Sequence, residues 1–109
     1  EILGEGSKLL LLTEDDELLS FCTFAKRDEI QPTGLCPWIG FAYTFKVYRG
    51  RRLLGLLINY AVELAKGQKQ YCIYLSTDHI GLYEKYGFVR HGTVITTHGG
   101  ETQLYTKAL

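Results

Sequence analysis

The sequence predicts a single α/β domain built on a mixed, mostly antiparallel sheet. Two hairpins are indicated, one joining residues 8–13 to 18–26 and the other joining 88–97 to 102–107, and a hairpin pairs its strands antiparallel. Between them, residues 38–76 have the pattern of a strand, a helix and a second strand. Such a unit is a right-handed crossover that makes its two strands parallel. We therefore expect one parallel pair within an otherwise antiparallel sheet, with helices on its faces.

The first three strands are predicted in the N-terminal half of the chain. Residues 8–13 are rich in leucine, residues 14–17 form an acidic turn, and residues 18–26 have the aromatic and threonine content of a strand. Residues 27–37 contain two prolines and a glycine and are predicted to form a loop. In the strand at 38–45, four side chains alternate onto one face and are expected to lie in the core: Ile39, Phe41, Tyr43 and Phe45.

The main helix is predicted at residues 52–66, because apolar residues recur there at helical spacing. Gly67 is expected to end this helix, and residues 71–76 to form the next strand. A short capped helix is then predicted from Asp78, whose carboxylate can accept from the first free amides, to Gly87, which supplies a left-handed residue. The residues of the main helix expected to face the sheet are Leu53, Leu54, Leu57, Ile58, Ala61, Leu64 and Ala65.

Charge and hydropathy argue against several classes of protein. Twelve basic and twelve acidic side chains give a formal net charge of zero, so no overall field would draw the chain to nucleic acid or to a membrane surface. No apolar run approaches the eighteen residues of a spanning helix, and we expect no secretion leader. We therefore expect a cytoplasmic protein.

Cysteines and histidines do not indicate a metal or disulfide site. Cys22, Cys36 and Cys72 are odd in number and lack CxxC spacing, which argues against a disulfide framework and favours a reducing compartment. We expect all three to be buried as small hydrophobic residues. His91 and His98 flank a predicted strand without a third ligand, so no metal site is predicted.

Two motifs suggest a function. The sequence LYEKYGF at residues 82–88 presents Tyr83 on a short helix, although Tyr83 alone is most simply a core aromatic whose hydroxyl reaches water. The basic, glycine-containing turn at residues 49–55 opens the main helix directly after a strand, where free amides and the helix dipole favour an anion. The alternative for this turn is a solvated helix entry with no ligand.

This order of elements and motifs resembles the GNAT superfamily of N-acetyltransferases, which use acetyl-coenzyme A, from about residue 9 to residue 109. The family's loop is usually written Gln/Arg-x-x-Gly-x-Gly/Ala. Here Arg49 keeps the arginine, Arg52 and Leu54 stand where glycines usually do, and Gly55 comes one residue later. The family normally places a strand and two helices before the first strand seen here. Because the chain starts at Glu1 and contains no methionine, we expect residues 1–109 to be one N-terminally incomplete GNAT-like domain.

The resemblance implies where acetyl-coenzyme A would bind. The two parallel strands of the family splay apart, and the pantetheine arm lies in the opening against the backbone of Tyr43, Thr44 and Phe45. The pyrophosphate lies over the amides at the start of the main helix, where arginines add charge-assisted contacts. The implied cofactor-binding residues are Tyr43, Thr44, Phe45, Arg49, Gly50, Arg51, Arg52, Leu53, Leu54, Gly55 and Ser76.

The catalytic roles also follow from the resemblance. Tyr83 occupies the position of the general acid that protonates the departing thiolate, and a backbone amide near Phe45 would donate to the thioester oxygen. An imidazole can accept a proton near neutral pH, so His79 is a candidate base, with a capping or packing role as the alternative. Asp28 and Glu29 are candidates for holding a cationic acceptor, with a solvated loop as the alternative.

The predicted function is direct transfer of an acetyl group from acetyl-coenzyme A to an amine in a ternary complex. Small molecules and protein amino groups both stay open as acceptors, and so does a homodimer. The alternative is a non-catalytic module of the same fold that binds coenzyme A or uses its aromatic groove for a partner. A nucleotide-binding protein is disfavoured, because no Walker-type Gly-Lys-Ser/Thr sequence follows the arginine-rich turn.

Overall fold

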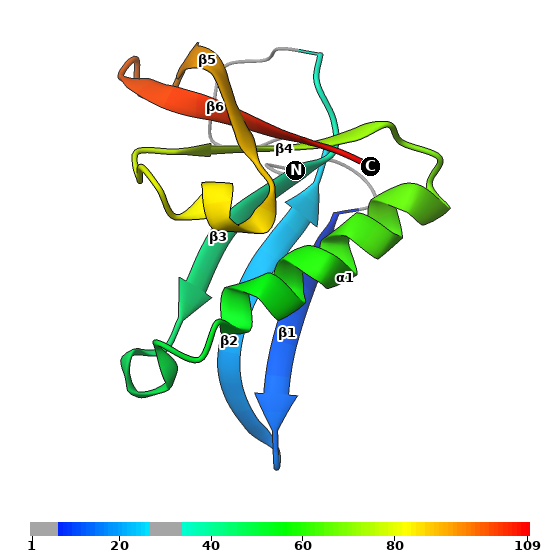
Figure 1. Ribbon diagram of the computed structural model, residues 1–109, viewed down its shortest axis with the longest axis vertical. Coiled ribbons are helices and arrows are strands. Elements are labelled where there is room, and N and C mark those ends of the chain that lie inside the picture. The colour runs from blue at the N-terminus through cyan, green and yellow to red at the C-terminus, as the bar shows by residue number, and fades with distance from the viewer. Residues whose placement is uncertain (1–6, 27–33) are drawn as a thin grey trace.

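The computed structural model describes residues 7–26 and 34–109, which form a six-stranded sheet in the order β1-β2-β3-β4-β6-β5 (Figure 1). Neighbouring strands are antiparallel except for β3 and β4, which are parallel, so the predicted mixed sheet is confirmed. The strands are β1 (Lys8–Glu14), β2 (Glu17–Ala25), β3 (Trp38–Thr44), β4 (Cys72–Thr77), β5 (Val89–Ile95) and β6 (Glu101–Ala108). The helices are α1 (Leu53–Gly67) and the short 3₁₀ helices η1 (Lys46–Tyr48) and η2 (Tyr83–Tyr86).

The first hairpin is closed by a two-residue turn. Asp15 and Asp16 adopt φ values of 51° and 65°, the left-handed pair that matches the twist of antiparallel strands. Aspartate tolerates this conformation better than most residues, because its short side chain bonds nearby backbone groups. The acidic turn predicted at residues 14–17 therefore lies where it was expected.

The aromatic face predicted for β3 is wrong, because a β-bulge changes its alternation. Phe21 pairs with Tyr43 and Thr23 with Gly40, so one residue of β2 opposes two of β3. The extra residue sends Ile39 into the core beside α1 and Tyr43 to the other face. Tyr43 and Phe45 are 43% and 38% exposed, and their rings meet Phe21 instead of the core. The side chain of Phe41 lies outside the described part of the structure.

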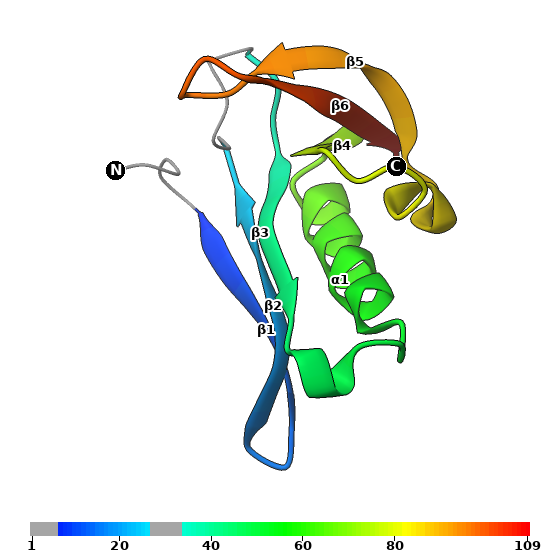
Figure 2. The same ribbon diagram turned by 90° about the vertical axis from the view of Figure 1, so that its left-hand side faces the viewer.

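Helix α1 packs along β1, β2 and β3 (Figure 2), and its buried face is close to the predicted one. Val62 also belongs to this face, whereas Leu54 and Leu64 are only half-buried. The helix ends at Gly67, as predicted, although Gly67 is its last helical residue and not the residue after it. The left-handed residue that follows is Lys69, with φ 60°. The core side chains that contact one another here are Leu10, Cys22, Phe24, Ile39, Leu57, Ile58, Ala61, Ala65, Ile73 and Leu75.

The short helix is later and tighter than predicted, and Asp78 does not cap it. The chain bends from residue 78 to 82, and η2 begins only at Tyr83, after Leu82. Gly81, with φ 87°, lies in the left-handed region and interrupts any helix that would begin at Asp78. Gly87, with φ 90°, ends η2 as predicted.

The three cysteines have free thiols, but their environments differ from the prediction. Cys22 is fully buried, whereas Cys36 and Cys72 are half-buried. Burial raises the pKa of the Cys22 thiol to about 11, because a thiolate would lose its hydration there. Within residues 7–26 and 34–109, no helix is long and apolar enough to cross a membrane, and no three His, Cys, Asp or Glu side chains form a group that could hold a metal ion.

Candidate coenzyme and active site

A cavity of about 630 Å³ lies between the C-terminal ends of β3 and β4. The two strands pair at a single position, Trp38 with Tyr74, and then separate toward their C-terminal ends. An opening of this kind exposes backbone N–H and C=O groups that no neighbouring strand satisfies. The cavity is lined by Ile39, Gly40, Ala42, Tyr43, Thr44, Tyr48, Arg49, Gly50, Arg52, Leu53, Leu54, Leu75, Ser76, Thr77, His79, Leu82 and Tyr83.

The start of α1 forms one end of this cavity. Arg52 precedes the helix in the left-handed conformation, at φ 56° and ψ 32°, and the amide of Gly55 already donates to its carbonyl over 3.1 Å. The earlier amides of a helix have no partner within the helix, so those of Leu53 and Leu54 are suited to an anion. Gly50, with φ 89°, makes the preceding turn.

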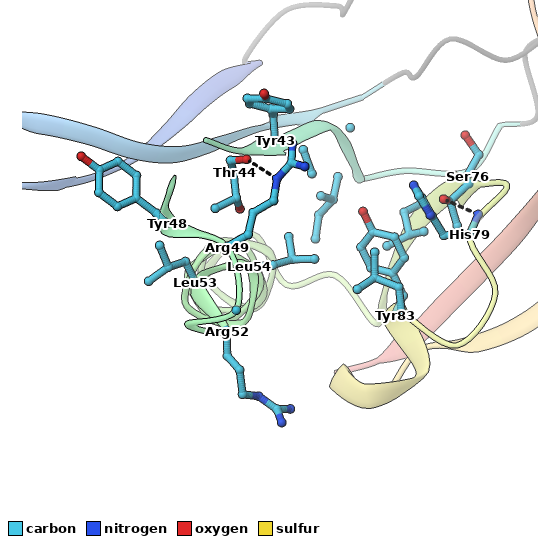
Figure 3. A pocket seen from close by; sticks show the side chains of 17 residues that line it. Tyr43, Thr44, Tyr48, Arg49, Arg52, Leu53, Leu54, Ser76, His79 and Tyr83 are labelled. Carbon is cyan, nitrogen blue, oxygen red and sulfur yellow. Dashed lines mark hydrogen bonds between the residues drawn. The ribbon is translucent and has the colours of Figure 1, made fainter. Parts of the chain in front are cut away.

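The three arginines of this turn point in different directions. Arg49 lies in the cavity, where its Nε donates to the Thr44 carbonyl over 2.9 Å and its guanidinium lies 5.3 Å from the centre of the Tyr43 ring (Figure 3). Arg51 points out to Glu14 at the tip of the first hairpin, with 3.5 Å between nitrogen and oxygen. Arg52 projects from the other side of the helix start and lies over the Tyr86 ring, 5.6 Å from its centre.

Tyr83 forms the opposite wall of the cavity. Tyr83 is 8% exposed, and its ring packs edge to face against that of Phe88, with 6.1 Å between the ring centres. Figure 3 shows its hydroxyl directed into the space that Leu54 and Arg49 face from α1 and the preceding turn. The cavity therefore joins a buried phenol to a basic helix start.

Glu84 fixes the bend that carries Tyr83. One carboxylate oxygen accepts from the Gly81 amide over 3.0 Å, and the other accepts from the Tyr105 hydroxyl of β6 over 3.2 Å. Burial, and then the neighbouring Glu84 carboxylate, raise the pKa of Tyr105 above its ordinary value, so this phenol stays protonated and able to donate. Glu84 thus links the bend at residues 78–82 to strand β6 of the sheet.

His79 stands at the rim of the cavity. Its amide donates to Thr77 Oγ1 over 3.1 Å, which turns the chain as it leaves β4. The side chain is exposed and lies on the same side of the cavity as Tyr83 and Ser76 (Figure 3).

Comparison with known proteins agrees with this geometry. Residues 2–88 match the Acetyltransferase (GNAT) family. The chain belongs to the GNAT acetyltransferase family. None of the curated proteins searched matches it.

Solved GNAT structures share the fold at low identity. An aminoglycoside 6'-acetyltransferase type Ii is 18% identical with a TM-score of 0.75, over 96% of this chain and 70% of that one. An aminoglycoside 6'-N-acetyltransferase complexed with coenzyme A is 15% identical with a TM-score of 0.75, over 96% and 74%. A putative streptothricin acetyltransferase from Bacillus anthracis str. Ames, in complex with acetyl coenzyme A, is 18% identical with a TM-score of 0.77, over 97% and 64%.

Most of the residues predicted from the GNAT resemblance line the cavity, and three do not. Phe45, Arg51 and Gly55 lie outside its lining. A backbone amide near Phe45 was predicted to meet the thioester oxygen, and the amide of Phe45 itself donates to the Leu19 carbonyl of β2 over 3.0 Å. Asp28 and Glu29 lie outside the described residues. The predicted residues that the structure brings together in the lining are Tyr43, Thr44, Arg49, Gly50, Arg52, Leu53, Leu54, Ser76, His79 and Tyr83.

A glycine is needed at position 55 because of a neighbouring side chain, and not because of an approach to the coenzyme, as its place in the GNAT loop suggested. A Cβ atom at this position would lie 2.9 Å from Cε1 of Tyr86. The glycine therefore lets the Tyr86 ring of η2 approach α1 closely.

Sequence reasoning missed Tyr48, Glu84 and Tyr105. Tyr48 lines the cavity, and its hydrogen bond to Glu17, followed by smaller burial and charge effects, raises its pKa. It directly precedes the Arg49 motif, which was a usable signal. Tyr105 lies 21 residues after Glu84, and nothing in the local sequence indicates their contact.

Proposed function

We propose that this chain transfers an acetyl group from acetyl-coenzyme A to an amine, with Tyr83 as the general acid. One observation carries the proposal: a single cavity contains both the basic start of α1 and the phenol of Tyr83. Acetyl transfer from a coenzyme A thioester needs an anion site for the pyrophosphate and a proton donor near the sulfur. The coenzyme A and acetyl coenzyme A bound to two similar structures support this ligand.

The backbone of β3 suits the pantetheine arm. The Tyr43 carbonyl accepts from Ser20 Oγ over 2.8 Å, and the Phe45 amide donates to the Leu19 carbonyl. The backbone polar groups of Tyr43 and Phe45 therefore point toward β2. Backbone groups of successive residues alternate in direction along a strand, so Thr44 directs its own toward the opening beside β4. Its carbonyl already accepts from Arg49. We assign the amide of Thr44, next to Phe45, as the donor to the bound thioester or its pantetheine arm.

Tyr83 supplies a proton where the coenzyme's thiolate leaves. Bound acetyl-coenzyme A supplies the activated thioester. A phenol of ordinary pKa near 10 gives its proton to a thiolate of pKa near 8.5 at a cost of about 2 kcal/mol, and solvent then replaces the proton. The Tyr83 ring is buried, whereas its hydroxyl lies at the cavity wall, where it can reach both the thiolate and the solvent that replaces the proton. Arg49, pinned by Thr44 and Tyr43, orients the pyrophosphate without having to be ordered on binding.

His79 is the proposed proton acceptor for the incoming amine. An amine attacks only in its neutral form, and an imidazole is the side chain that accepts protons near pH 7. Its exposed position at the rim allows transfer directly or through one water.

A non-catalytic binding module of the same fold is the second candidate. The observation that favours it is an aromatic cluster formed by the exposed Tyr43 and Phe45 and the half-buried Phe21, whose ring centres lie 5.4 to 6.3 Å apart. Exposed aromatic residues are enriched at protein interfaces. Under this alternative coenzyme A binds but no acetyl group is transferred.

Thermal unfolding with acetyl-coenzyme A tests the ligand. A ligand that binds only the folded chain stabilises it by about 2.7 kcal/mol at a hundredfold excess over its dissociation constant. We expect a clear rise in melting temperature with acetyl-coenzyme A and almost none with ATP. Equal shifts with both would indicate non-selective anion binding, and no shift with acetyl-coenzyme A would remove the proposed function.

A further inference from the structure

Ser20 is a polar residue buried in the middle of β2, with 0% of its surface exposed. Side chains alternate along a strand, so Ser20 lies on the same face as Cys22, which belongs to the core beside α1. A hydroxyl that leaves water loses free energy unless it is hydrogen-bonded. The hydrogen bonds that Ser20 makes therefore decide what it does.

Both hydrogen bonds of Ser20 go to the end of β3. Its Oγ donates to the Tyr43 carbonyl over 2.8 Å. A hydroxyl has a single proton, so Thr44 is the donor in the second contact, which joins the hydroxyl oxygens of Ser20 and Thr44 over 2.8 Å. The two bonds form a chain from the Thr44 hydroxyl through Ser20 to the Tyr43 carbonyl.

The Tyr43 carbonyl and the Thr44 amide belong to the same peptide unit. In a planar trans peptide the C=O and N–H bonds point in opposite directions. A carbonyl held toward β2 therefore turns the Thr44 N–H toward the opening beside β4. Because β3 and β4 pair only at Trp38 and Tyr74, the direction of this peptide unit is set from β2.

Ser20 also changes the strength of the Thr44 amide as a hydrogen-bond donor. Hydrogen bonds in a chain polarise one another, so a bond made to the carbonyl of a peptide unit makes its N–H a stronger donor. The carbonyl oxygen has two lone pairs, and the Ser20 bond can add to the backbone pairing of β2 with β3. Since Ser20 is fully buried, water does not compete for this bond.

We propose that Ser20 is a positioning residue for acetyl transfer, whose hydroxyl directs and polarises the Thr44 amide toward the carbonyl oxygen of the acetyl thioester. The inference rests on the proposed function and names the thioester oxygen as the target of that amide. When the amine nitrogen bonds to the carbonyl carbon, the π electron pair moves onto this oxygen, and the Thr44 N–H stabilises the charge. Ser20 keeps its proton and does not line the cavity, so it acts through the peptide unit.

Isotope-edited infrared spectroscopy with acetyl-coenzyme A labelled with ¹³C at the acetyl carbonyl tests this role. A hydrogen bond to the carbonyl oxygen lowers the C=O stretching frequency, so binding to the parent chain should lower it. Ser20→Ala should lose roughly 10–30% of that shift, the share that one bond adds to its neighbour in a chain. Its kcat with a panel of primary amines should fall about three- to tenfold with little change in KM, because the amide bonds most strongly to the charged oxygen of the transition state.

Two further variants show whether the hydroxyl itself is responsible. Ser20→Thr keeps the hydroxyl and should restore both the frequency shift and kcat. Thr23→Val removes a hydroxyl from the opposite face of β2, at a residue that is 8% exposed, and should change neither. Circular dichroism checks that each variant folds. Should Ser20→Ala unfold, Ser20→Cys takes its place, because a thiol is a weak donor and predicts the same direction of change.

The outcomes separate this inference from the function it rests on. If the parent binds acetyl-coenzyme A and Ser20→Ala keeps the parent frequency and kcat, the role of Ser20 is overturned and acetyl transfer stands. A lower kcat without a change in frequency, the same losses in Thr23→Val, or a folded Ser20→Thr that restores neither quantity also overturns it. A parent complex with the frequency of free acetyl-coenzyme A removes the Thr44 amide as donor, and with it the role of Ser20. If acetyl-coenzyme A does not bind the parent, the proposed function fails as well.

Discussion

Tyr83 is positioned by a residue that takes no part in the proposed chemistry. The two oxygens of Glu84 bond to the Gly81 amide and to the Tyr105 hydroxyl, so one carboxylate joins the bend before Tyr83 to strand β6. The Tyr83 ring is then fixed by Phe88 on its other side. A general acid must be within hydrogen-bond reach of the atom it protonates, and these contacts fix the Tyr83 hydroxyl at the cavity wall.

Alkaline pH should destabilise the fold through Cys22. The folded thiol has a pKa of about 11, above the ordinary 9.0, so the folded chain keeps its proton while the unfolded chain ionises. The contribution of this thiol to the free energy of unfolding is therefore fully present below pH 9. It falls by about 2–3 kcal/mol as the pH rises from 9 to 11. Chemical denaturation at several pH values should show a shallower fall for Cys22→Ala than for the parent.

The pKa values of Tyr48, Tyr74 and Tyr105 are also raised, so these tyrosines add to the pH dependence in alkali, and the comparison with Cys22→Ala isolates the thiol. Identical pH slopes for the two proteins would show that Cys22 ionises as readily when folded as when unfolded.

The sequence predicted individual residues well where a local rule applied. Gly87 ends η2 in the left-handed region because the LYEKYGF motif needs a residue without a Cβ there. The prediction that Asp78 caps the short helix was wrong, because the left-handed Gly81 lies between Asp78 and the start of η2 at Tyr83. The Glu84–Tyr105 contact joins residues 21 apart across two elements, and no local rule could reveal it.

Among the elements, β3 shows what periodicity cannot detect. Alternation placed Ile39 and Tyr43 on one face, but the bulge between Gly40 and Tyr43 separates them. A bulge depends on the pairing of two strands, so a single strand's pattern does not contain it. Helix α1 was predicted to within about one residue at each end, because its apolar spacing extends over several turns and averages out local exceptions.

The contact between α1 and η2 predicts that one substitution has opposite effects in two backgrounds. Gly55→Ala forces the Tyr86 ring to move and should lower the free energy of unfolding by about 1–3 kcal/mol. In a Tyr86→Ala background the collision is absent, and the same change should instead stabilise the helix by about 0.5–1 kcal/mol. Denaturant unfolding of the four proteins measures this cycle.

A loss of stability from Gly55→Ala that is the same size in both backgrounds would mean that Gly55 serves something other than the Tyr86 ring.

At the scale of the whole molecule, the parallel pair creates the site. Because β3 and β4 meet only at Trp38 and Tyr74, the sheet opens where α1 begins and where η2 delivers Tyr83. The crossover was predictable from the order of elements, and the family resemblance predicted that these strands diverge. The directions of Arg51 and Arg52 were not predictable, since they depend on Glu14 at a hairpin tip and on Tyr86 in another element.

The turnover of Tyr83→Phe tests the central claim most directly. The change keeps the ring against Phe88 and removes only the hydroxyl, so folding and acetyl-coenzyme A affinity should be retained. Thiol release from acetyl-coenzyme A, measured with a panel of primary amines, should slow by roughly 10²- to 10⁴-fold in kcat with little change in KM. Tyr71→Phe, at a residue that is 88% exposed, is the control and should match the parent. A parent rate in Tyr83→Phe, with single-turnover kinetics showing that chemistry limits the rate, would contradict the general-acid role.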